Sequence, residues 1–401
     1  MATAKTIEGN MLIAQSGGPT AVINQSLIGA VLEARKYKAI KNIYGALHGI
    51  QGILDENLIN LKKESKTTLE AVAGTPSSAL GSVRRKPTPD DCAAIFKVLA
   101  KYNVRYFFYI GGNDSAETTH IINEEAKKSK YQLRCFHICK TIDNDLRQND
   151  HTPGFGSAGK FVAQAFMGDN LDNLALRGVK INVIMGRHAG FLTAASALAR
   201  HNEEDGPHLI YLPERPFAMS RFISDVKAVH RKYGRCVIAV SEGISDARGI
   251  PIVTKAAAAK EVDSHGNVQL SGTGALGDIL AQEIKNKTSI GRVRADTFGY
   301  LQRSFAGVYS ESDAREARQV GRDAVKFAIQ SRGGTVVLKR KPGKRYACTT
   351  ALAPLSRVAK FTKSMDARYV NKAGNNITPA FVRYAAPLAG ELHPTALLRG
   401  L

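Results

Sequence analysis

Three short apolar runs constrain the fold most, because a polar turn containing glycine or aspartate follows each of them closely. The runs are MLIAQ (Met11–Gln15), YFFYI (Tyr106–Ile110) and LRCFHI (Leu133–Ile138), and the turns contain SGGPT, GGNDS and KTIDND. Runs of this length that are rich in aliphatic and aromatic residues predict buried strands. A buried strand that leaves through a glycine turn is typical of α/β proteins.

Amphipathic stretches separate these runs along the chain. Apolar residues recur with a helical period in 21–34, 90–102 and 116–128. A second series places expected strands at 180–185, 209–212 and 236–240, each followed by polar residues or glycine. Strands that alternate with helices predict a mostly parallel sheet, on which ligands bind at the carboxyl ends of the strands. We therefore expect the SGG, GGNDS and TIDND turns to lie on one edge of a sheet.

The length of 401 residues, with 44% apolar residues, predicts two domains or one large α/β unit. No run of about 18 apolar residues occurs, so neither a transmembrane helix nor a membrane partner is expected. The N-terminus lacks the apolar core of a signal peptide. Five cysteines without CxxC spacing favour reduced thiols in a cytoplasmic protein. Residues 339–350 read as a basic exposed loop, and 351–401 as a moderately helical tail.

The formal net charge of +21 raises nucleic-acid binding as a non-enzymatic alternative. The basic residues are scattered, however, and cluster only at 84–86 and 339–345. No basic motif with interleaved aromatic residues of the RNA-binding type is present. Anionic substrates explain part of the excess charge, so nucleic acid is not expected as a main partner.

The KTIDND segment offers the clearest chemistry. Asp143 and Asp145 lie one residue apart, and Lys140 precedes Asp143 by three residues. Two carboxylates beside glycine turns suit phosphate chemistry, since one can accept a proton while the other helps to hold a metal. Gly17 and Gly18 lie between a strand and a helix, where free N–H groups and the helix dipole favour an anion. Taken alone, TIDND could also be a polar surface turn.

Seven separated motifs, in order, resemble the phosphofructokinase family over about residues 10–340: QSGGPTAVIN, LGSVR, IGGNDS, KTIDND, VIMGRHAGFLTAAS, SEG and GYLQR. KTIDND together with MGRHAG is the most specific pair. The resemblance implies two similar Rossmann-like α/β domains with mostly parallel sheets and the active site in the cleft between them. It implies a donor-binding domain of residues 1–155 with about 303–350. Residues 156–302 with C-terminal helices in about 351–401 would bind the sugar phosphate.

The resemblance also implies Mg²⁺-assisted transfer of a phosphoryl group to the 1-hydroxyl of fructose 6-phosphate. By position, the catalytic residues would be Asp143 as the base, Lys140 and Arg187. The donor would meet Gly17, Gly18, Arg84, Gly112, Asp114 and Ser115. The sugar phosphate would meet Thr141, Asp143, Met185, Gly186, Arg187, Glu242, Arg294, Tyr300 and Arg303. Asn113, where the family usually has aspartate, and Asp145 are the metal candidates.

Two positions bear on the phosphoryl donor. ATP-using relatives tend to carry glycine where this chain has Asp114 and Lys140. Asp114 would add bulk and negative charge near a nucleotide's α-phosphate, whereas Lys140 offers a compact cation to pyrophosphate. Pyrophosphate is therefore the expected donor, in glycolysis or its reverse. The alternatives are an ATP-dependent 6-phosphofructokinase and a sedoheptulose 7-phosphate kinase. The family position of Arg294 implies a homodimer or homotetramer, in which it reaches a neighbouring subunit's site.

Overall fold

The computed structural model describes residues 7–255, 274–330, 333–359 and 361–398. The chain divides into two compact units: unit 1 is Met1–Phe155 with Arg303–Lys363, and unit 2 is Gly156–Gln302 with Ser364–Leu401. The expected division near residue 350 instead falls after Lys363, because a strand in this region pairs within the sheet of unit 1. None of the described helices is long and apolar enough to cross a membrane.

Unit 1 is built on a seven-stranded sheet with the order β11-β10-β5-β4-β1-β2-β3. The five central strands run parallel, and the two edge strands are antiparallel to their neighbours, so the expected mostly parallel sheet is confirmed. The strands are β1 (Gly9–Gln15), β2 (Ile40–Ala46), β3 (Leu58–Asn60), β4 (Val104–Gly111), β5 (Arg134–Cys139), β10 (Gly333–Arg340) and β11 (Cys348–Ala353).

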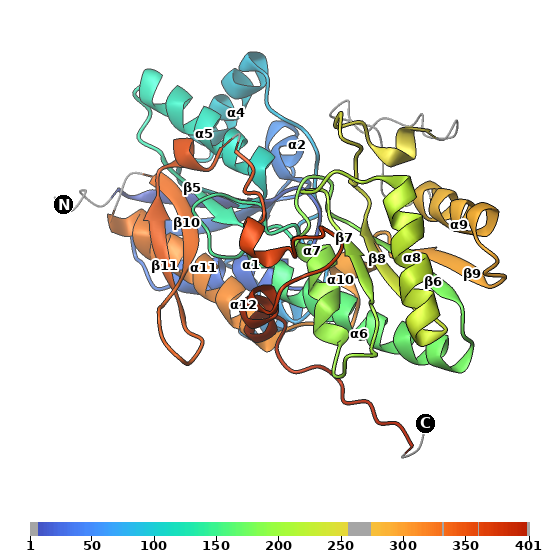
Figure 1. The fold of residues 1–401 in the computed structure, drawn as a ribbon. Coiled ribbons are helices and arrows are strands. Elements are labelled where there is room, and N and C mark those ends of the chain that lie inside the picture. The colour runs from blue at the N-terminus through green and yellow to red at the C-terminus, as the bar shows by residue number, and fades with distance from the viewer. Residues whose placement is uncertain (1–6, 256–273, 331–332, 360, 399–401) are drawn as a thin grey trace. The chain divides into compact units, whose positions relative to one another are not determined.

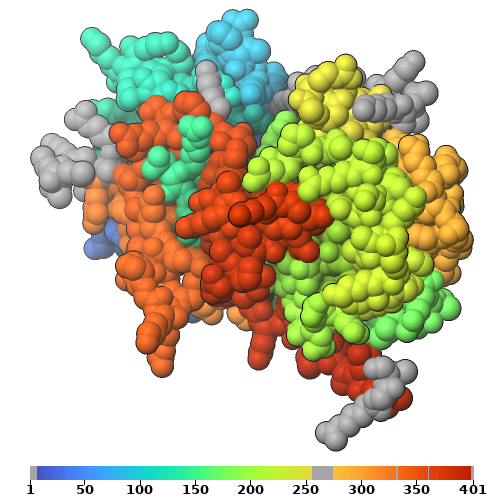
Figure 2. All heavy atoms as spheres, viewed as in Figure 1, coloured from blue at the N-terminus to red at the C-terminus, as the bar shows by residue number. Residues whose placement is uncertain are grey.

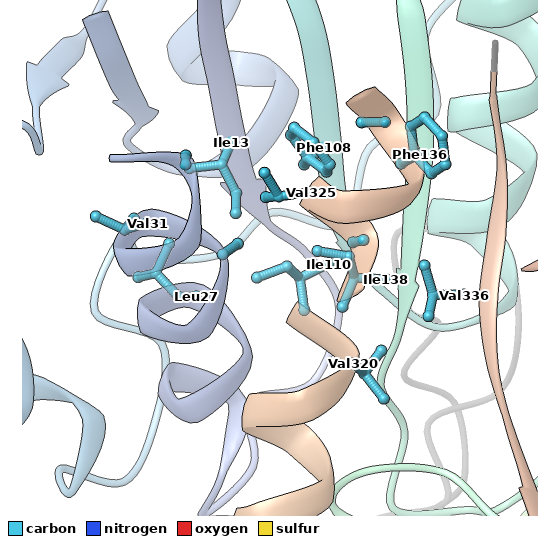
Figure 3. Packing of buried hydrophobic residues seen from close by; sticks show 14 of the residues in the cluster. Ile13, Leu27, Val31, Phe108, Ile110, Phe136, Ile138, Val320, Val325 and Val336 are labelled. Carbon is cyan, nitrogen blue, oxygen red and sulfur yellow. The ribbon is translucent and has the colours of Figure 1, made fainter. Parts of the chain in front are cut away.

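Helices cover both faces of this sheet (Figure 1). One face packs against α1 (Ile23–Ala34), α3 (Lys66–Ala73) and α11 (Glu311–Gln330), and the other against α2 (Gly49–Leu54), α4 (Pro89–Lys101) and α5 (Asn113–Lys128). Because side chains alternate along a strand, neighbouring residues enter opposite cores: Ile13 faces α1 and α11, whereas Leu12 faces α2 and α4. Figure 3 shows the first of these cores. Burial on both faces explains why the central strands read as continuous apolar runs.

Unit 2 holds a four-stranded, all-parallel sheet with the order β7-β8-β6-β9. Its strands are β6 (Val179–Ile184), β7 (Leu209–Tyr211), β8 (Cys236–Ser241) and β9 (Val293–Thr297). The α8 helix (Met219–Tyr233) packs Phe222 and Val226 against this sheet beside Leu280 of α9 (Ala275–Lys287). The other α-helices among the described residues of this unit or at the unit boundary are α6 (Phe155–Ala175), α7 (Phe191–Ala194), α10 (Leu301–Ser304) and α12 (Pro379–Ala389).

The C-terminal region differs from the sequence-based expectation. Residues 339–350 are not one loop, because β10 continues to Arg340 and β11 begins at Cys348, leaving residues 341–347 as the connection. Figure 2 shows this hairpin, in orange, standing out from the surface of unit 1. In the described part of the tail, helical structure is limited to α12 and two 3-10 turns, at 355–357 and 367–369. The strand was missed because CTTALA has no apolar run.

Candidate functional site

The three polar turns of unit 1 follow neighbouring strands. β4 lies between β1 and β5, and all three run parallel. The last residues of these strands are in register, since Gln15 pairs with Ile110 and Gly111 with Cys139. The SGG, GGNDS and KTIDND segments therefore leave the same edge of the sheet side by side, as the sequence predicts.

Two glycines after β1 make room for cations. Gly17 has φ +74°, and a Cβ there would lie 3.3 Å from the Lys140 ammonium nitrogen. That nitrogen donates a hydrogen bond of 2.5 Å to the Gly18 carbonyl. A Cβ at Gly18 would lie 3.2 Å from the guanidinium carbon of Arg303. Side chains at these two positions would thus crowd the two cations.

Lys140 is a buried cation, with 2% of its surface exposed. Burial and the positive charge of Arg303 lower the pKa of Lys140 to about 7, and Arg84 acts in the same direction. The negative charges of Asp143 and Asp145 oppose this shift but do not overcome it. An anion bound beside Lys140 would restore its charged form, because an opposite charge at short range favours ionisation.

The two arginines of LGSVRRK, Arg84 and Arg85, have different neighbours. Arg84 lies close enough to Lys140 to affect its pKa, whereas Arg85 pairs with Asp91 at 2.7 Å. The next residue, Lys86, pairs with Asp114 at 3.0 Å and with Glu117 at 2.9 Å. Sequence reasoning missed Lys86, although it belongs to a basic cluster. A nucleotide phosphate near Asp114 would therefore meet an ion pair and not an isolated carboxylate.

The GGNDS turn starts a long helix. Gly112 is the N-cap of α5, and Asn113, Asp114 and Ser115 form its first turn. Backbone N–H groups in a first turn have no partner within the helix, so they and the helix dipole can bind an anion. The preceding Gly111 is required by packing, because a Cβ there would lie 1.9 Å from the Ser115 hydroxyl.

Hydrogen bonds fix the shape of the TIDND loop. The Thr141 hydroxyl accepts from the Asp143 N–H at 3.1 Å, and the Thr141 N–H donates to the Pro153 carbonyl at 3.2 Å. Asn144 adopts the left-handed conformation with φ +57°. Asparagine tolerates this conformation better than most residues. The loop therefore holds Asp143 and Asp145 on either side of a defined backbone reversal.

Asn113 and Asp145, the two metal candidates, lie in contact. The Asn113 amide donates to the Asp145 carboxylate at 2.9 Å. The amide oxygen of Asn113 is buried and has no hydrogen-bond partner among the residues that the structure describes. Burial and the negative charge of Asp143 raise the pKa of the Asp145 carboxyl to about 7. A cation with a preference for oxygen ligands would satisfy the amide oxygen and favour ionised carboxylates.

Lys363 also supports the TIDND loop, although no motif in the sequence indicates this role. Its N–H donates to the Asp145 carbonyl at 2.6 Å. Its ammonium donates to the Asp150 carbonyl at 2.9 Å, the Asn149 carbonyl at 3.2 Å and the Asn144 amide oxygen at 3.3 Å. Burial lowers the pKa of Lys363 to about 8. The residue lies in the tail, where no motif in the sequence marks it.

Replacing Lys363 with methionine should lower kcat about tenfold and change KM less, because the carbonyls it binds would lose a charged donor and the loop would lose its fixed shape. Steady-state kinetics and urea unfolding of the variant measure both effects. Lys62→Met is the matched control, since Lys62 is exposed and donates to the Lys41 carbonyl. Equal kcat for Lys363→Met and wild type would show that Lys363 does not position the loop.

In unit 2, two neighbouring strands carry the residues expected to bind sugar phosphate. Met185 and Gly186 follow β6, and Glu242 follows β8, with Ile184 and Ser241 in register. The Gly186 N–H points to the Glu242 carboxylate at 3.5 Å, and the Ser241 hydroxyl donates to the Gly186 carbonyl at 2.6 Å. The structure therefore brings the MGR and SEG segments together.

Arg187 completes this group, because a Cβ at Gly243 would lie 2.0 Å from its carbonyl oxygen. The other residues expected here lie on β9, which pairs with β6, or after it. Arg294 is the exposed second residue of the edge strand β9, and Tyr300 has 51% of its surface exposed beyond the end of that strand. Arg303 belongs to unit 1, where it lies beside Gly18 among the expected donor-binding residues, and its contact with the sugar phosphate stays a prediction.

A cluster away from these residues also has metal-ligand spacing. Among the described residues, His151, Glu316 and Cys348 place one ligand atom each within 4.8 Å of the others. The two ring nitrogens of His151 contact Glu316 at 2.6 Å and Asp150 at 2.8 Å. Burial opposes the charged ring, but these two carboxylates raise the pKa of His151 above its ordinary value. A charged imidazole held between two carboxylates explains the geometry without a metal.

Glycine turns, buried cations and an acidic loop at strand ends are characteristic of α/β proteins that bind phosphate groups. A profile of the phosphofructokinase family matches residues 10–328, so the chain belongs to that family.

Similar proteins extend over nearly the whole chain. A pyrophosphate–fructose 6-phosphate 1-phosphotransferase of Rhodospirillum rubrum is 56% identical over 390 residues, covering 97% of this chain and 96% of that protein. One from Xanthomonas campestris is 40% identical and covers 97% and 93%. The crystal structure of a pyrophosphate-dependent phosphofructokinase from Marinobacter aquaeolei matches with a TM-score of 0.86 and 32% identity, covering 98% of this chain and 94% of that one.

Proposed function

We infer that this protein reversibly transfers a phosphoryl group from pyrophosphate to the 1-hydroxyl of fructose 6-phosphate. The products are fructose 1,6-bisphosphate and orthophosphate, in glycolysis or its reverse. The names of the relatives that match nearly the full chain support the reaction. The observation that carries the choice of donor is the buried Lys140, which lies against the Gly18 carbonyl and near Arg303 and Arg84.

Pyrophosphate would bind where the turns of unit 1 converge. The N–H groups of the first turn of α5, together with Lys140, Arg84 and Arg303, present positive charge to a compact, highly charged anion. Gly17 and Gly18 let the donor approach the backbone. Since the effect of each charge grows as water is excluded, a buried lysine stabilises transition-state charge more than an exposed one.

Asp143 is the proposed base. As the 1-hydroxyl oxygen of the sugar bonds to the terminal phosphorus, the hydroxyl proton passes to the Asp143 carboxylate. The bond from that phosphorus to the bridging oxygen breaks, and orthophosphate leaves. The loop hydrogen bonds from Thr141 and Lys363 hold Asp143 in place for this transfer. Met185, Gly186, Arg187, Glu242 and Tyr300 would bind the sugar phosphate.

Mg²⁺ is the proposed metal, and Asn113 and Asp145 would hold it. When bound, it would neutralise charge on the phosphate oxygens. Replacing Asn113 with leucine, which keeps the size but removes the amide oxygen, should raise the Mg²⁺ concentration for half-maximal activity about tenfold. Chelation with EDTA should abolish turnover in wild type, and added Mg²⁺ should restore it.

The measurement is a Mg²⁺ titration of initial rates for wild type, Asn113→Leu and Asn42→Leu. Asn42 is a matched control, because its side chain bonds to Asn10 and Asn60 within the sheet region. If Asn113→Leu requires no more Mg²⁺ than wild type, the amide oxygen does not bind the metal.

We also propose that the protein is a cytoplasmic homodimer or homotetramer in which Arg294 serves a neighbouring subunit's site. The exposure of Arg294 on an edge strand supports this. Arg294→Ala and Asp143→Asn chains, each poorly active alone, should regain activity when mixed and reassembled. Sedimentation confirms hybrid formation, and hybrids without rescue would contradict shared sites. Cell fractionation tests the compartment.

The reaction itself is tested by ³¹P NMR of purified protein with Mg²⁺, pyrophosphate and either fructose 6-phosphate or sedoheptulose 7-phosphate. We expect fructose 1,6-bisphosphate and orthophosphate to appear together, and the reverse reaction to regenerate pyrophosphate. If sedoheptulose 7-phosphate is turned over faster than fructose 6-phosphate, then sedoheptulose 7-phosphate is the preferred substrate. Nucleic-acid binding with a steep salt dependence and no phosphoryl transfer would favour the non-enzymatic alternative.

A further inference from the structure

Unit 2 contains a small cavity of about 190 Å³ at the carboxyl end of β7. One wall is apolar and includes the buried side chains of Tyr211, Leu212 and Phe217. Arg215, Arg221 and Lys372 also line the cavity, and no acidic residue does. None of the residues proposed to bind the substrates lines it either.

The three cations are exposed at the surface of unit 2. Through their side chains, Arg215, Arg221 and Lys372 form no hydrogen bond or ion pair with any other residue that the structure describes. Two carboxylates close to these cations in the sequence have other hydrogen-bond partners. Asp225 accepts from the Tyr211 hydroxyl at 2.8 Å, and Glu214 accepts from the Gly190 N–H at 2.8 Å. Three like charges around one small cavity repel one another, and an anion would relieve that repulsion.

The frame of the cavity is ordered by hydrogen bonds. Asn371 accepts from the N–H groups of Asn375 and Asn376, both at 3.1 Å, which closes the turn that carries Lys372. The Ile210 N–H donates to the Asn375 carbonyl at 2.9 Å, which fixes this turn to β7. The Arg215 side chain runs along the turn, since a Cβ at Gly374 would lie 3.6 Å from it. Two separate segments of the chain thus carry the cations, and the turn that carries Lys372 is fixed to β7.

The N-terminus of α8 adds positive potential at the lining of the cavity. Ala218 is both a lining residue and the N-cap of α8, a helix of 15 residues, and it offers no side chain to cap the helix. The N–H groups of the first turn therefore add partial positive charge to that of Arg221. The apolar wall would instead pack against carbon atoms.

We propose that this cavity binds a small organic phosphate, with its phosphate group on Arg215, Arg221 and Lys372 and its organic part on the apolar wall. A cavity of about 190 Å³ is smaller than the roughly 300–1,000 Å³ of typical drug-sized sites, so the ligand is compact. The site is separate in composition from the proposed substrate residues. The cavity would therefore be a second ligand site, distinct from the site of the proposed reaction.

Calorimetric titration with phenyl phosphate tests the proposal, because this probe combines a phosphate dianion with a small apolar ring. The full chain would be titrated in EDTA with saturating pyrophosphate and fructose 6-phosphate, so that the proposed catalytic residues are occupied and no turnover occurs. We expect one probe per chain with a Kd of about 1 mM or tighter. Inorganic phosphate, titrated in the same way, should bind at least threefold more weakly because it lacks contact with the wall.

The Arg215→Gln/Lys372→Gln double variant should weaken phenyl phosphate binding at least tenfold. Lys227→Gln/Arg231→Gln is the matched control, because it removes two exposed charges from α8 away from the cavity, and its Kd should stay within twofold of wild type. Absence of saturable binding, or an unchanged Kd in the first variant, would overturn the proposal. Inorganic phosphate binding as tightly as phenyl phosphate would overturn the role of the apolar wall. Binding is measured without turnover, so these outcomes do not depend on the proposed reaction.

Discussion

Asp143→Asn should lower kcat by about 10²–10⁴-fold while leaving the affinity for fructose 6-phosphate largely unchanged. The amide cannot accept the hydroxyl proton as a carboxylate does, but it has the same shape. The backbone bond from residue 143 to the Thr141 hydroxyl does not involve the side chain, so the loop should keep its conformation. Steady-state kinetics and direct sugar-phosphate binding measure the two effects separately.

Asp90→Asn is a suitable control for that prediction, because Asp90 is exposed in the first turn of α4 and faces none of the candidate site residues. Its kcat should match wild type. If Asp143→Asn keeps more than about a tenth of wild-type kcat, the proton passes elsewhere and Asp143 is not the base.

Lys140→Gly should reduce kcat with pyrophosphate about a hundredfold, because a buried cation facing transition-state charge is worth about 3 kcal/mol. Asp114→Gly should raise ATP use slightly by removing bulk near the donor. The gain is limited because Asp114 is already paired with Lys86, so removing its charge leaves Lys86 with Glu117. The double variant should use ATP better than either single variant, since both room and charge change.

These two substitutions are expected to be non-additive, because both residues act on the same donor from neighbouring loops. Values of kcat/KM for both donors, in wild type, the two single variants and the double variant, give the interaction energy. Lys128→Gly is the control variant, because it removes a lysine from the exposed end of α5. Unchanged pyrophosphate turnover in Lys140→Gly would contradict the role of that residue.

The arrangement of unit 1 could be predicted because its central strands are buried on both faces. MLIAQ and YFFYI have few interpretations other than parallel strands, and the turns after them had to meet on one edge. β11 could not be found in this way, because its sequence, CTTALA, has no apolar run and its partner β10 is held by tertiary pairing. Short elements such as α3 and β3 likewise gave no distinct signal.

The site residues that directly follow a strand could be predicted from the sequence. The site residues that come from distant segments of the chain could not. Asp143, Lys140 and Gly17 lie at strand ends, so sequence order places them together. Lys363 and Arg303 reach the same region from later parts of the chain through tertiary contacts that no spacing rule describes. The unpartnered Asn113 oxygen depends on burial, which the sequence does not reveal at a polar turn.

The donor preference is the central claim, and one measurement tests it most directly. Wild-type protein would be assayed with fructose 6-phosphate and Mg²⁺, with pyrophosphate or ATP as the varied donor, and kcat/KM would be compared. We predict a preference for pyrophosphate of at least about a hundredfold, in line with the contribution of Lys140. A higher kcat/KM for ATP would contradict the account and identify an ATP-dependent enzyme.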